Sequence, residues 1–375
     1  MGCRCGCIDA KTCVGELDVD VERSWDRGGM TGEHQGRRAG DLRTAVTRLA
    51  SLDCRVVGHR LVERELRTRS GWLRRTVEIE VASDGGASVG RGEWAGFAAE
   101  ERAWWSSDGA LAWLDGLVGR GTLAERAAHL DHAPTPAVRA ASEAALLSLA
   151  LAQSDVTFAD VCGGAASTFR FVLSSSLGAP PRWEWFDQGG AGVGRKVDVD
   201  PRWSDEDWSR LADRSELCVL DAKARGGRGR RGTVLGSERA AWWARRRPDV
   251  WVEDPDDGAI EPLLSEGGRI AFDAELRTER DLERLPRGGA GIGVNLKPAR
   301  VGGPLFLLEL AADALVRGST PYVGGSFELG AGRSQLQVLA SVIAPGAPND
   351  AAPSASFTES WSLPSGGRGQ PPGSF

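Results

Sequence analysis

Short apolar runs alternate with longer, charge-rich stretches throughout the second half of the chain. Each run has the length of a β-strand, and each stretch between two runs suits a helix with its loops. Strands and helices in succession predict a parallel sheet, because parallel strands need a crossover connection. Seven such runs favour a closed (β/α)8 barrel, the TIM-barrel fold, over an open, doubly wound sheet. The runs occupy residues 168–175, 194–200, 217–223, 249–255, 269–275, 291–298 and 320–328.

The first half of the chain has a different pattern. Residues 76–81 alternate between apolar and polar, residues 83–86 form a turn sequence, and the chain then returns, which predicts a β-hairpin. Residues 135–153 predict a helix, with Thr135 as its cap and Pro136 in its first turn. Together these elements predict a small α+β domain that precedes the barrel.

The composition of each segment sets the expected domain boundaries. Residues 1–46 are rich in Gly, Asp and Arg and lack periodicity, so we expect them to be disordered. Residues 47–155 form the α+β domain and residues 156–342 the barrel, while residues 343–375 are expected to return to the α+β domain.

Net charge and hydropathy exclude several classes of protein. The 375 residues are 41% hydrophobic and 26% charged, with a net charge of -6. Acidic and basic residues are interspersed, which argues against nucleic-acid binding and against a basic membrane-surface face. No stretch approaches the roughly 18 apolar residues of a membrane-spanning helix. We therefore expect a cytoplasmic protein, and a symmetric homo-oligomer is a further possibility.

Four cysteines crowd the start of the sequence, "MGCRCGCIDAKTC". No histidine or second Cys-x-x-Cys pair completes a tetrahedral zinc site. The start also lacks the charged and apolar regions of a signal peptide. These residues therefore fit a flexible tail, or a sequence whose translation really begins nearer Met30.

Three consecutive runs of the expected barrel end in a carboxylate: Asp221, Glu253 and Asp273. A charge after a strand can simply begin a solvated loop, but the ends of barrel strands meet at one mouth, where such folds carry their chemistry. Carboxylate oxygens without histidine or cysteine suit Mg2+ or Mn2+ better than zinc. Such an ion can bind a substrate carboxylate and stabilise the charge that develops when the adjacent carbon loses a proton.

Lysine is rare in this chain, which has only four lysines among 46 basic residues. Unlike arginine, lysine can lose and regain a proton when its surroundings lower its pKa. All four histidines precede the expected barrel, so they cannot supply a base on its later strands. Lys297, Lys223 and Lys196 lie at the ends of the runs and are the candidate catalytic residues, with a pKa that a neighbouring metal ion would lower.

Several motifs together resemble the enolase superfamily: "VWVEDP", "IAFDAEL", "VNLKPARVGG" and "YVGGSFELGAGRSQLQVLAS". They are similar to the branch that includes muconate-lactonising enzymes, o-succinylbenzoate synthases and dipeptide epimerases, and to a functionally unassigned subgroup of it. The segment "RTVEIEVASDGGASVGRGEW" resembles the capping domain of that family. The resemblance implies Mg2+-stabilised abstraction of the proton alpha to a carboxylate through an enediolate. Dehydration, racemisation or epimerisation, and cycloisomerisation would all be open outcomes for a small-molecule carboxylate substrate.

The chain departs from that branch where the reaction type is decided. Lys196 is followed two residues later by Asp198, where the branch usually has a second lysine, and Asp221 is followed two residues later by Lys223 in place of asparagine. Either lysine could therefore face Lys297 across the substrate. These departures also leave open a degenerate, non-catalytic barrel that binds a small carboxylate as a sensor or scaffold.

Three further residues are candidates for substrate binding. Asp198 occupies the position where the branch usually has its second lysine, and Glu328 ends the last of the seven runs. Trp72 lies in a loop of the α+β domain, and in the family that this chain resembles such loops close over the metal.

Overall fold

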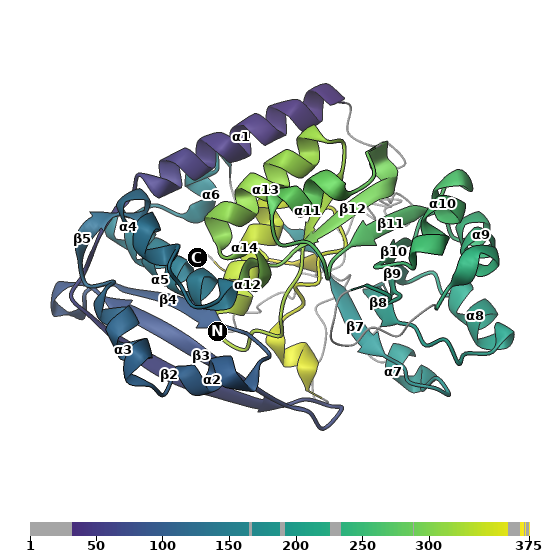
Figure 1. The fold of residues 1–375 in the computed structure, drawn as a ribbon, viewed down its shortest axis with the longest axis horizontal. Helices are drawn as coiled ribbons and strands as arrows, with labels where there is room; N and C mark the ends of the chain where they lie inside the picture. Colours follow the sequence, from purple (N-terminus) through teal and green to yellow (C-terminus); the bar gives the residue numbers. More distant parts are fainter. Residues whose placement is uncertain are drawn as a thin grey trace, which may run out of the picture.

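The computed structural model describes residues 32–164, 167–187, 192–225, 234–287, 289–358, 368–370, 372 and 375. An N-terminal domain, running from β1 to α5, lies beside a ring of parallel strands that begins at β7 (Figure 1). The cysteine-rich start falls outside the described residues, so its role stays a prediction.

The N-terminal domain contains the hairpin and the helix that the sequence predicts. An antiparallel sheet in the order β2-β3-β4 packs against α5, whose first turn is capped by the Thr135 side chain. Gly90 and Gly92 let the helix approach closely, because a Cβ on either residue would lie within 2.2 Å of an α5 backbone oxygen. The bounds are β2 Gly58–Arg67, β3 Leu73–Ala82, β4 Val89–Trp94 and α5 Pro136–Gln153.

Smaller elements complete this domain. A two-stranded antiparallel sheet joins β1 to β5, and three short helices connect it to the larger sheet and to α5. The bounds are β1 Asp53–Val56, α2 Ala99–Trp104, α3 Asp108–Asp115, β5 Gly119–Thr122 and α4 Leu123–Leu130.

The first helix, α1 (Gly32–Ala50), corrects the expected disorder of residues 1–46. It lies along the outside of α13 (Pro304–Val316), as Figure 1 shows. Leu42 and Leu49 on α1 are buried, and Arg43 forms an ion pair with Asp313 of α13 at 2.6 Å. The Gly- and Arg-rich composition concealed a helical spacing of buried apolar residues, so the prediction of disorder is wrong for residues 32–46.

Seven parallel strands form one curved sheet in the order β13-β12-β11-β10-β9-β8-β7, and each coincides with one of the seven predicted runs. The alternation of strands and helices along the chain therefore produces the parallel sheet that the sequence predicts. The strand bounds are β7 Val172–Ser176, β8 Gly194–Asp198, β9 Leu217–Asp221, β10 Trp251–Glu253, β11 Arg269–Phe272, β12 Ile292–Leu296 and β13 Thr320–Val323.

The eighth position of the barrel is reduced to two residues, Asn349 and Asp350. Asn349 pairs with Phe171 just before β7, and Asp350 pairs with Gly324 just after β13, both in parallel. The backbone amide of Val172 also donates a hydrogen bond to the backbone carbonyl oxygen of Asn349 at 2.9 Å. These bridges join the two edges of the sheet, so the (β/α)8-type barrel with an N-terminal α+β domain is confirmed.

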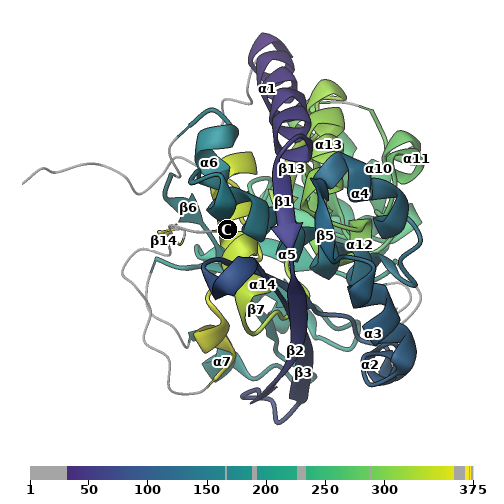
Figure 2. The same ribbon diagram turned by 90° about the vertical axis from the view of Figure 1, so that its left-hand side faces the viewer.

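Helices surround the strands, and two views at right angles show α1 and α13 on the outside (Figure 2). Across the ranges given above, none of the helices has both the length and the apolarity to cross a membrane. A further short pair of strands joins β6 to β14. The remaining bounds are α6 Phe158–Val161, β6 Phe169–Arg170, α7 Trp183–Asp187, α8 Asp205–Ala212, α9 Gly236–Arg246, α10 Asp257–Ser265, α11 Glu279–Arg284, α12 Pro298–Val301, α14 Ala331–Ile343 and β14 Arg368–Gly369.

Two buried glutamates from the N-terminal sheet join it to the start of α14. Glu93 on β4 accepts hydrogen bonds from the backbone amides of Leu329, Gly330 and Gly332, at 2.6 to 3.0 Å. Glu78 on β3 accepts from the amide of Ala331 at 3.1 Å. A helix leaves its first amides without partners inside the helix, and here another domain supplies the acceptors.

Candidate functional site

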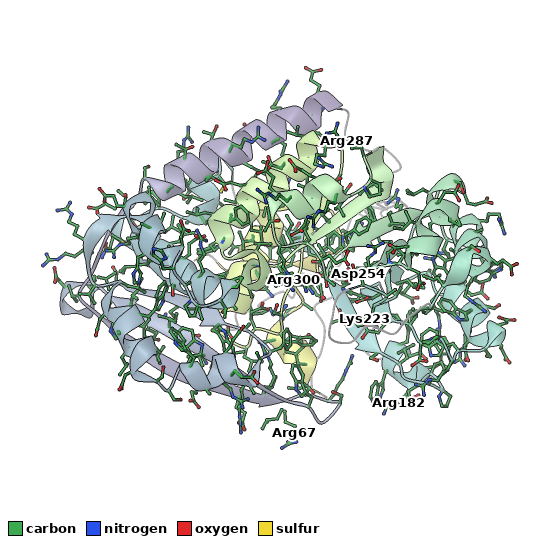
Figure 3. The ribbon with its side chains drawn as sticks, viewed as in Figure 1. Arg67, Arg182, Lys223, Asp254, Arg287 and Arg300 are labelled. Atoms are coloured by element: carbon green, nitrogen blue, oxygen red, sulfur yellow. The ribbon has the colours of Figure 1, made fainter. Side chains whose placement is uncertain are left out.

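The three predicted carboxylates lie where neighbouring strands end. Asp221 ends β9 and Glu253 ends β10, and the two residues pair directly across the sheet. Asp273 follows β11 by one residue. All three side chains are buried. We call the place where these strands end, together with the ends of β8 and β12, the mouth. Lys223, Asp254 and Arg300 are labelled near the centre of the view in Figure 3.

Lys196 on β8 is enclosed by carboxylates. Its Nζ bonds Glu253 Oε1 at short range and lies 3.4 Å from Asp221 Oδ2 and 3.7 Å from Asp350 Oδ2. Burial alone would lower the pKa of Lys196, but Glu253 and Asp221 outweigh burial and hold the pKa well above its usual value. Lys196 therefore acts as a fixed positive charge in the middle of the mouth.

Lys223 is the more accessible of the two early lysines. Its Nζ lies 2.7 Å from Asp221 Oδ2 and 3.1 Å from Asp198 Oδ1, and its side chain is 36% exposed, compared with 4% for Lys196. Burial opposes the charge of Lys223, but Asp198 and Asp221 raise its pKa. The backbone of Lys223 has a φ of 49°, a conformation that a side chain disfavours and that often marks functional sites.

Lys297 and Arg300 hold the third carboxylate. Lys297 Nζ lies 2.9 Å from Asp273 Oδ2, and Arg300 Nη1 lies 2.5 Å from Asp273 Oδ1. Burial would raise the pKa of Asp273, but Lys297 and Arg300 outweigh burial and hold it well below its usual value. Lys297 therefore engages the carboxylate that follows β11, while Lys223 engages the one that ends β9, with β10 and its Glu253 between them in the sheet.

Glu253 lies at the centre of a polar network that the sequence did not reveal. Its Oε2 accepts a hydrogen bond from the Tyr322 hydroxyl at 2.5 Å and another from Asn295 Nδ2 at 3.2 Å. Burial is the main reason that the pKa of Glu253 rises to about 7, with Lys196 opposing the rise. Asn295 Oδ1 is buried and has no hydrogen-bond partner in the described part of the chain.

Two further carboxylates at the mouth were also missed. Asp254 accepts from the amides of Asp273 and Ala274 at 2.9 and 3.0 Å, which fixes the turn that carries Asp273. Its φ is 47°, and its pKa rises to about 6, chiefly through burial and then through repulsion by Asp273. Asp350 accepts from Ser174 Oγ at 3.0 Å. Asp350 belongs to a strand position of only two residues, which is too short to leave an alternating pattern in the sequence.

The mouth has the donor chemistry and the charge that suit a divalent metal ion. When all are ionised, six carboxylates face four cations, which leaves an excess of two negative charges. The groups are Asp198, Asp221, Glu253, Asp254, Asp273 and Asp350 on one side, and Lys196, Lys223, Lys297 and Arg300 on the other. Hard carboxylate oxygens with uncompensated charge fit Mg2+ or Mn2+.

Those carboxylates are, however, paired with side-chain cations. Over the described ranges no three His, Cys, Asp or Glu side chains form a ready-made metal cage. Lys196 lies between Asp221 and Glu253, while Lys297 and Arg300 engage Asp273. The lysine pKa values also shift upward, opposite to the lowering expected beside a metal ion. A shared metal ion at Asp221, Glu253 and Asp273 therefore stays a prediction.

The candidate substrate-binding residues differ in their surroundings. Asp198 lies in the mouth beside Lys223. Glu328 is buried, pairs with Arg333 at 3.0 Å and accepts from the Ser326 amide at 2.7 Å, so its carboxylate is already engaged. Trp72 is 41% exposed, and its ring contacts that of Phe327, a residue of the loop that follows β13.

Solved structures with a similar fold belong to the enolase superfamily. A superfamily member from Listeria innocua is 18% identical with a TM-score of 0.65, covering 86% of this chain and 93% of that chain. A substrate-liganded L-Ala-D/L-Glu epimerase from Bacillus subtilis is 17% identical with a TM-score of 0.64, covering 85% and 97%. A Roseovarius nubinhibens protein of the mandelate racemase/muconate lactonizing enzyme type, complexed with magnesium, is 19% identical with a TM-score of 0.59, covering 82% and 89%.

At these identities the likeness shows the fold, and it confirms the resemblance to the enolase superfamily at that level. No curated protein matches the sequence. One family model matches residues 165–357, which span the barrel from before β7 to beyond Asp350. The chain belongs to the family described as "Domain of unknown function (DUF8230) C-terminal domain".

Proposed function

We propose that this protein is an enzyme that removes the proton alpha to the carboxylate of a small molecule, through an enediolate. Asp221, Glu253 and Asp273 would hold Mg2+, with Mn2+ as a substitute. The ion would bind the substrate carboxylate and offset the negative charge that forms as the proton leaves. Dehydration, racemisation or epimerisation, and cycloisomerisation are all compatible outcomes.

The single observation that supports this proposal most strongly is the excess of carboxylates over cations at the mouth, which leaves two negative charges when all the groups are ionised. Burying unpaired charge is costly unless a counter-ion or metal accompanies it. The raised pKa values of Glu253 and Asp254 have burial as their main cause and neighbouring carboxylates as a further one. The magnesium complex of the Roseovarius nubinhibens protein, which has the same fold, adds support.

The three lysines would have separate roles. Lys297 and Lys223 engage the carboxylates on either side of Glu253 in the sheet, and each would exchange a proton with one face of the substrate carbon. Once the charge of Asp221 and Asp273 is offset, these carboxylates no longer favour the ammonium forms, and either amine can act as a base. Lys196 is buried among Glu253 and Asp221, where it would fix their positions and attract the substrate carboxylate.

Deuterium exchange tests the reaction directly. A library of hydroxy-, amino- and N-acylamino acids would be incubated with the protein in D2O, with Mg2+ or with EDTA, and exchange at the alpha carbon followed by NMR. We expect Mg2+-dependent exchange of at least one member. Deuterium in products of both configurations at the alpha carbon would indicate epimerisation. Deuterium in a product of one configuration would indicate that a single base acts on one face of the carbon. No exchange across a broad library would refute the proposal.

A second candidate function is a non-catalytic barrel that binds a small carboxylate. The position of Lys196 favours it, because its ammonium group already lies between Asp221 and Glu253. Asp198 and Lys223 also differ from the lysine and the asparagine that are usual at these positions in the related branch, and this departure favours the second function as well. Carboxylate binding that is independent of Mg2+, without deuterium exchange, would support this second function.

A further inference from the structure

Three large aromatic side chains lie exposed beside one another at the edge of the mouth. Trp72 is 41% exposed, Phe97 is 61% exposed and Phe327 is 37% exposed. Trp72 stacks on Phe97 with ring centres 6.2 Å apart and meets Phe327 edge-on at 5.4 Å, while Phe327 contacts Phe357 at 5.2 Å. We call these four residues the aromatic rim. Single exposed apolar residues are normal, but a contiguous group calls for a ligand or partner.

Contacts within the barrel connect the aromatic rim to the mouth. Phe327 lies in the loop after β13. In the same loop, the backbone amide of Gly325 donates a hydrogen bond to the backbone carbonyl oxygen of Asp350 at 3.0 Å. The Asp350 carboxylate in turn lies 3.7 Å from Lys196 Nζ. On the other side, the amide of Arg69 donates to the Phe357 oxygen, and the Arg69 guanidinium donates to Ser175 Oγ on β7 at 2.9 Å. The aromatic rim is thus attached to the same end of the barrel as the carboxylates.

A buried arginine holds the rings in place. Arg74 donates hydrogen bonds to the backbone oxygens of Ala95, Gly96, Ser326 and Phe327, at 2.6 to 3.0 Å. It thereby ties the N-terminal domain to the loop after β13. Its guanidinium also lies 4.8 Å from the Phe97 ring centre and 5.7 Å from that of Trp72. The rings are therefore held before any ligand arrives, which lowers the cost of binding.

Phe327 has a strained backbone. Its φ is 60°, a conformation that is unusual for a bulky residue. Lys223 and Asp254 at the mouth have positive φ values as well, 49° and 47°. Strain of this kind persists at ligand sites because the surrounding structure enforces it. The strained conformation places the apolar ring of Phe327 at the surface, so the burial of apolar area does not account for the strain.

We infer that the aromatic rim receives an apolar, preferably planar, group of the substrate, so that the substrate is a carboxylate with an aryl or bulky alkyl substituent. This inference rests on the proposed function, because it takes the mouth as the site of the substrate carboxylate. The cation that lies over the rings of Trp72 and Phe97 is Arg74, and its guanidinium is already engaged by four backbone oxygens. Aromatic faces favour a planar apolar partner.

Calorimetry with small carboxylates tests this inference in the presence of Mg2+. The probes are butyrate, 4-phenylbutyrate and glutarate, which share a carboxylate and differ at the far end of the chain. We expect 4-phenylbutyrate to bind at least about tenfold more tightly than butyrate, and glutarate to gain nothing from its second carboxylate. Trp72→Ala and Phe97→Ala should each reduce the phenyl advantage by about threefold or more.

Leu111→Ala is the matched control. Leu111 is 51% exposed on α3, which lies well away from the barrel strands (Figure 1), so the phenyl advantage should persist. Melting temperatures check that each variant is folded, and Phe97→Leu gives a milder change at the most exposed ring. Sedimentation of the same variants tests whether the aromatic rim joins two copies of the chain instead.

The outcomes separate the inference from the proposed function. Equal binding of butyrate and 4-phenylbutyrate, or tighter binding of glutarate, would overturn the inference and leave the carboxylate site intact. A change of oligomeric state in Trp72→Ala with an unchanged phenyl advantage would also overturn it. If none of the three carboxylates binds, the proposed function itself fails, and the inference fails with it.

Discussion

Replacing Glu143 by glutamine should remove a pH dependence from the stability of the protein. Glu143 lies on α5, where its Oε1 accepts from the Leu305 amide and its Oε2 from Arg139 Nη1, both at 2.7 Å. The side chain is buried, and burial raises its pKa to about 7, against the opposing attraction of Arg139. This carboxyl group lies far along the chain from the carboxylates of the mouth and makes none of their contacts.

The sign and size follow from the two pKa values. In the unfolded chain Glu143 has a pKa of about 4.5. Between pH 4.5 and 7 the folded protein therefore binds more protons than the unfolded chain, so the free energy of unfolding falls as pH rises. From pH 5 to pH 8 this loss amounts to about 2.5 kcal/mol. Above pH 7 the loss is nearly complete, because both states are then ionised.

Urea unfolding of the wild type and of Glu143→Gln, at intervals from pH 5 to pH 8, measures this effect. Other titrating groups are common to both proteins, so the difference between the two curves isolates Glu143. We expect the wild type to lose about 2.5 kcal/mol relative to the variant over this range. Glu283→Gln, at an exposed position, is the control and should leave the pH dependence unchanged. A flat difference curve would refute the reasoning.

Three further changes test the site and the fold. Lys297→Ala should slow alpha-deuterium exchange at least about a hundredfold, the scale of a lost general base, with an unchanged circular dichroism spectrum; exchange at the wild-type rate would contradict its role. Asp273→Asn should weaken Mg2+ binding more than about tenfold by calorimetry, unlike the exposed control Asp108→Asn; equal affinity would count against this ligand. Leu49→Ala should lower the free energy of unfolding by about 2–5 kcal/mol, while Arg48→Ala should change it little; similar losses in both would argue against the packing of α1 on α13.

The barrel could be predicted because its strands leave a local signal. A strand buried on both faces needs a short, nearly continuous apolar run, and the chain shows such runs most clearly at β9, β10, β11 and β12. The first helix gave a weaker signal, because Leu42 and Leu49 are separated mostly by charged and small residues. Its contacts are also distant in sequence, since Arg43 on α1 pairs with Asp313 on α13, 270 residues later. Composition alone therefore suggested disorder where tertiary contact produces order.

The candidate site was predictable at the ends of strands and not between them. Asp221, Glu253 and Asp273 could be placed in one mouth from their positions after apolar runs. Which cation each carboxylate engages depends on how side chains from different strands meet, and that information is absent from any local pattern. Tyr322 illustrates the limit, because its position on β13 was predictable but its hydrogen bond to Glu253 was not.

The attachment of α14 has a consequence for how the chain can be divided. The amides of residues 329–332 find acceptors on Glu93 and Glu78, which precede the barrel by many residues in sequence. A barrel separated from its preceding sheet would expose these donors and lose two charges that favour the positive end of the helix. The chain should therefore melt in one cooperative transition, and a barrel cut away from the preceding sheet should be less stable than the whole chain.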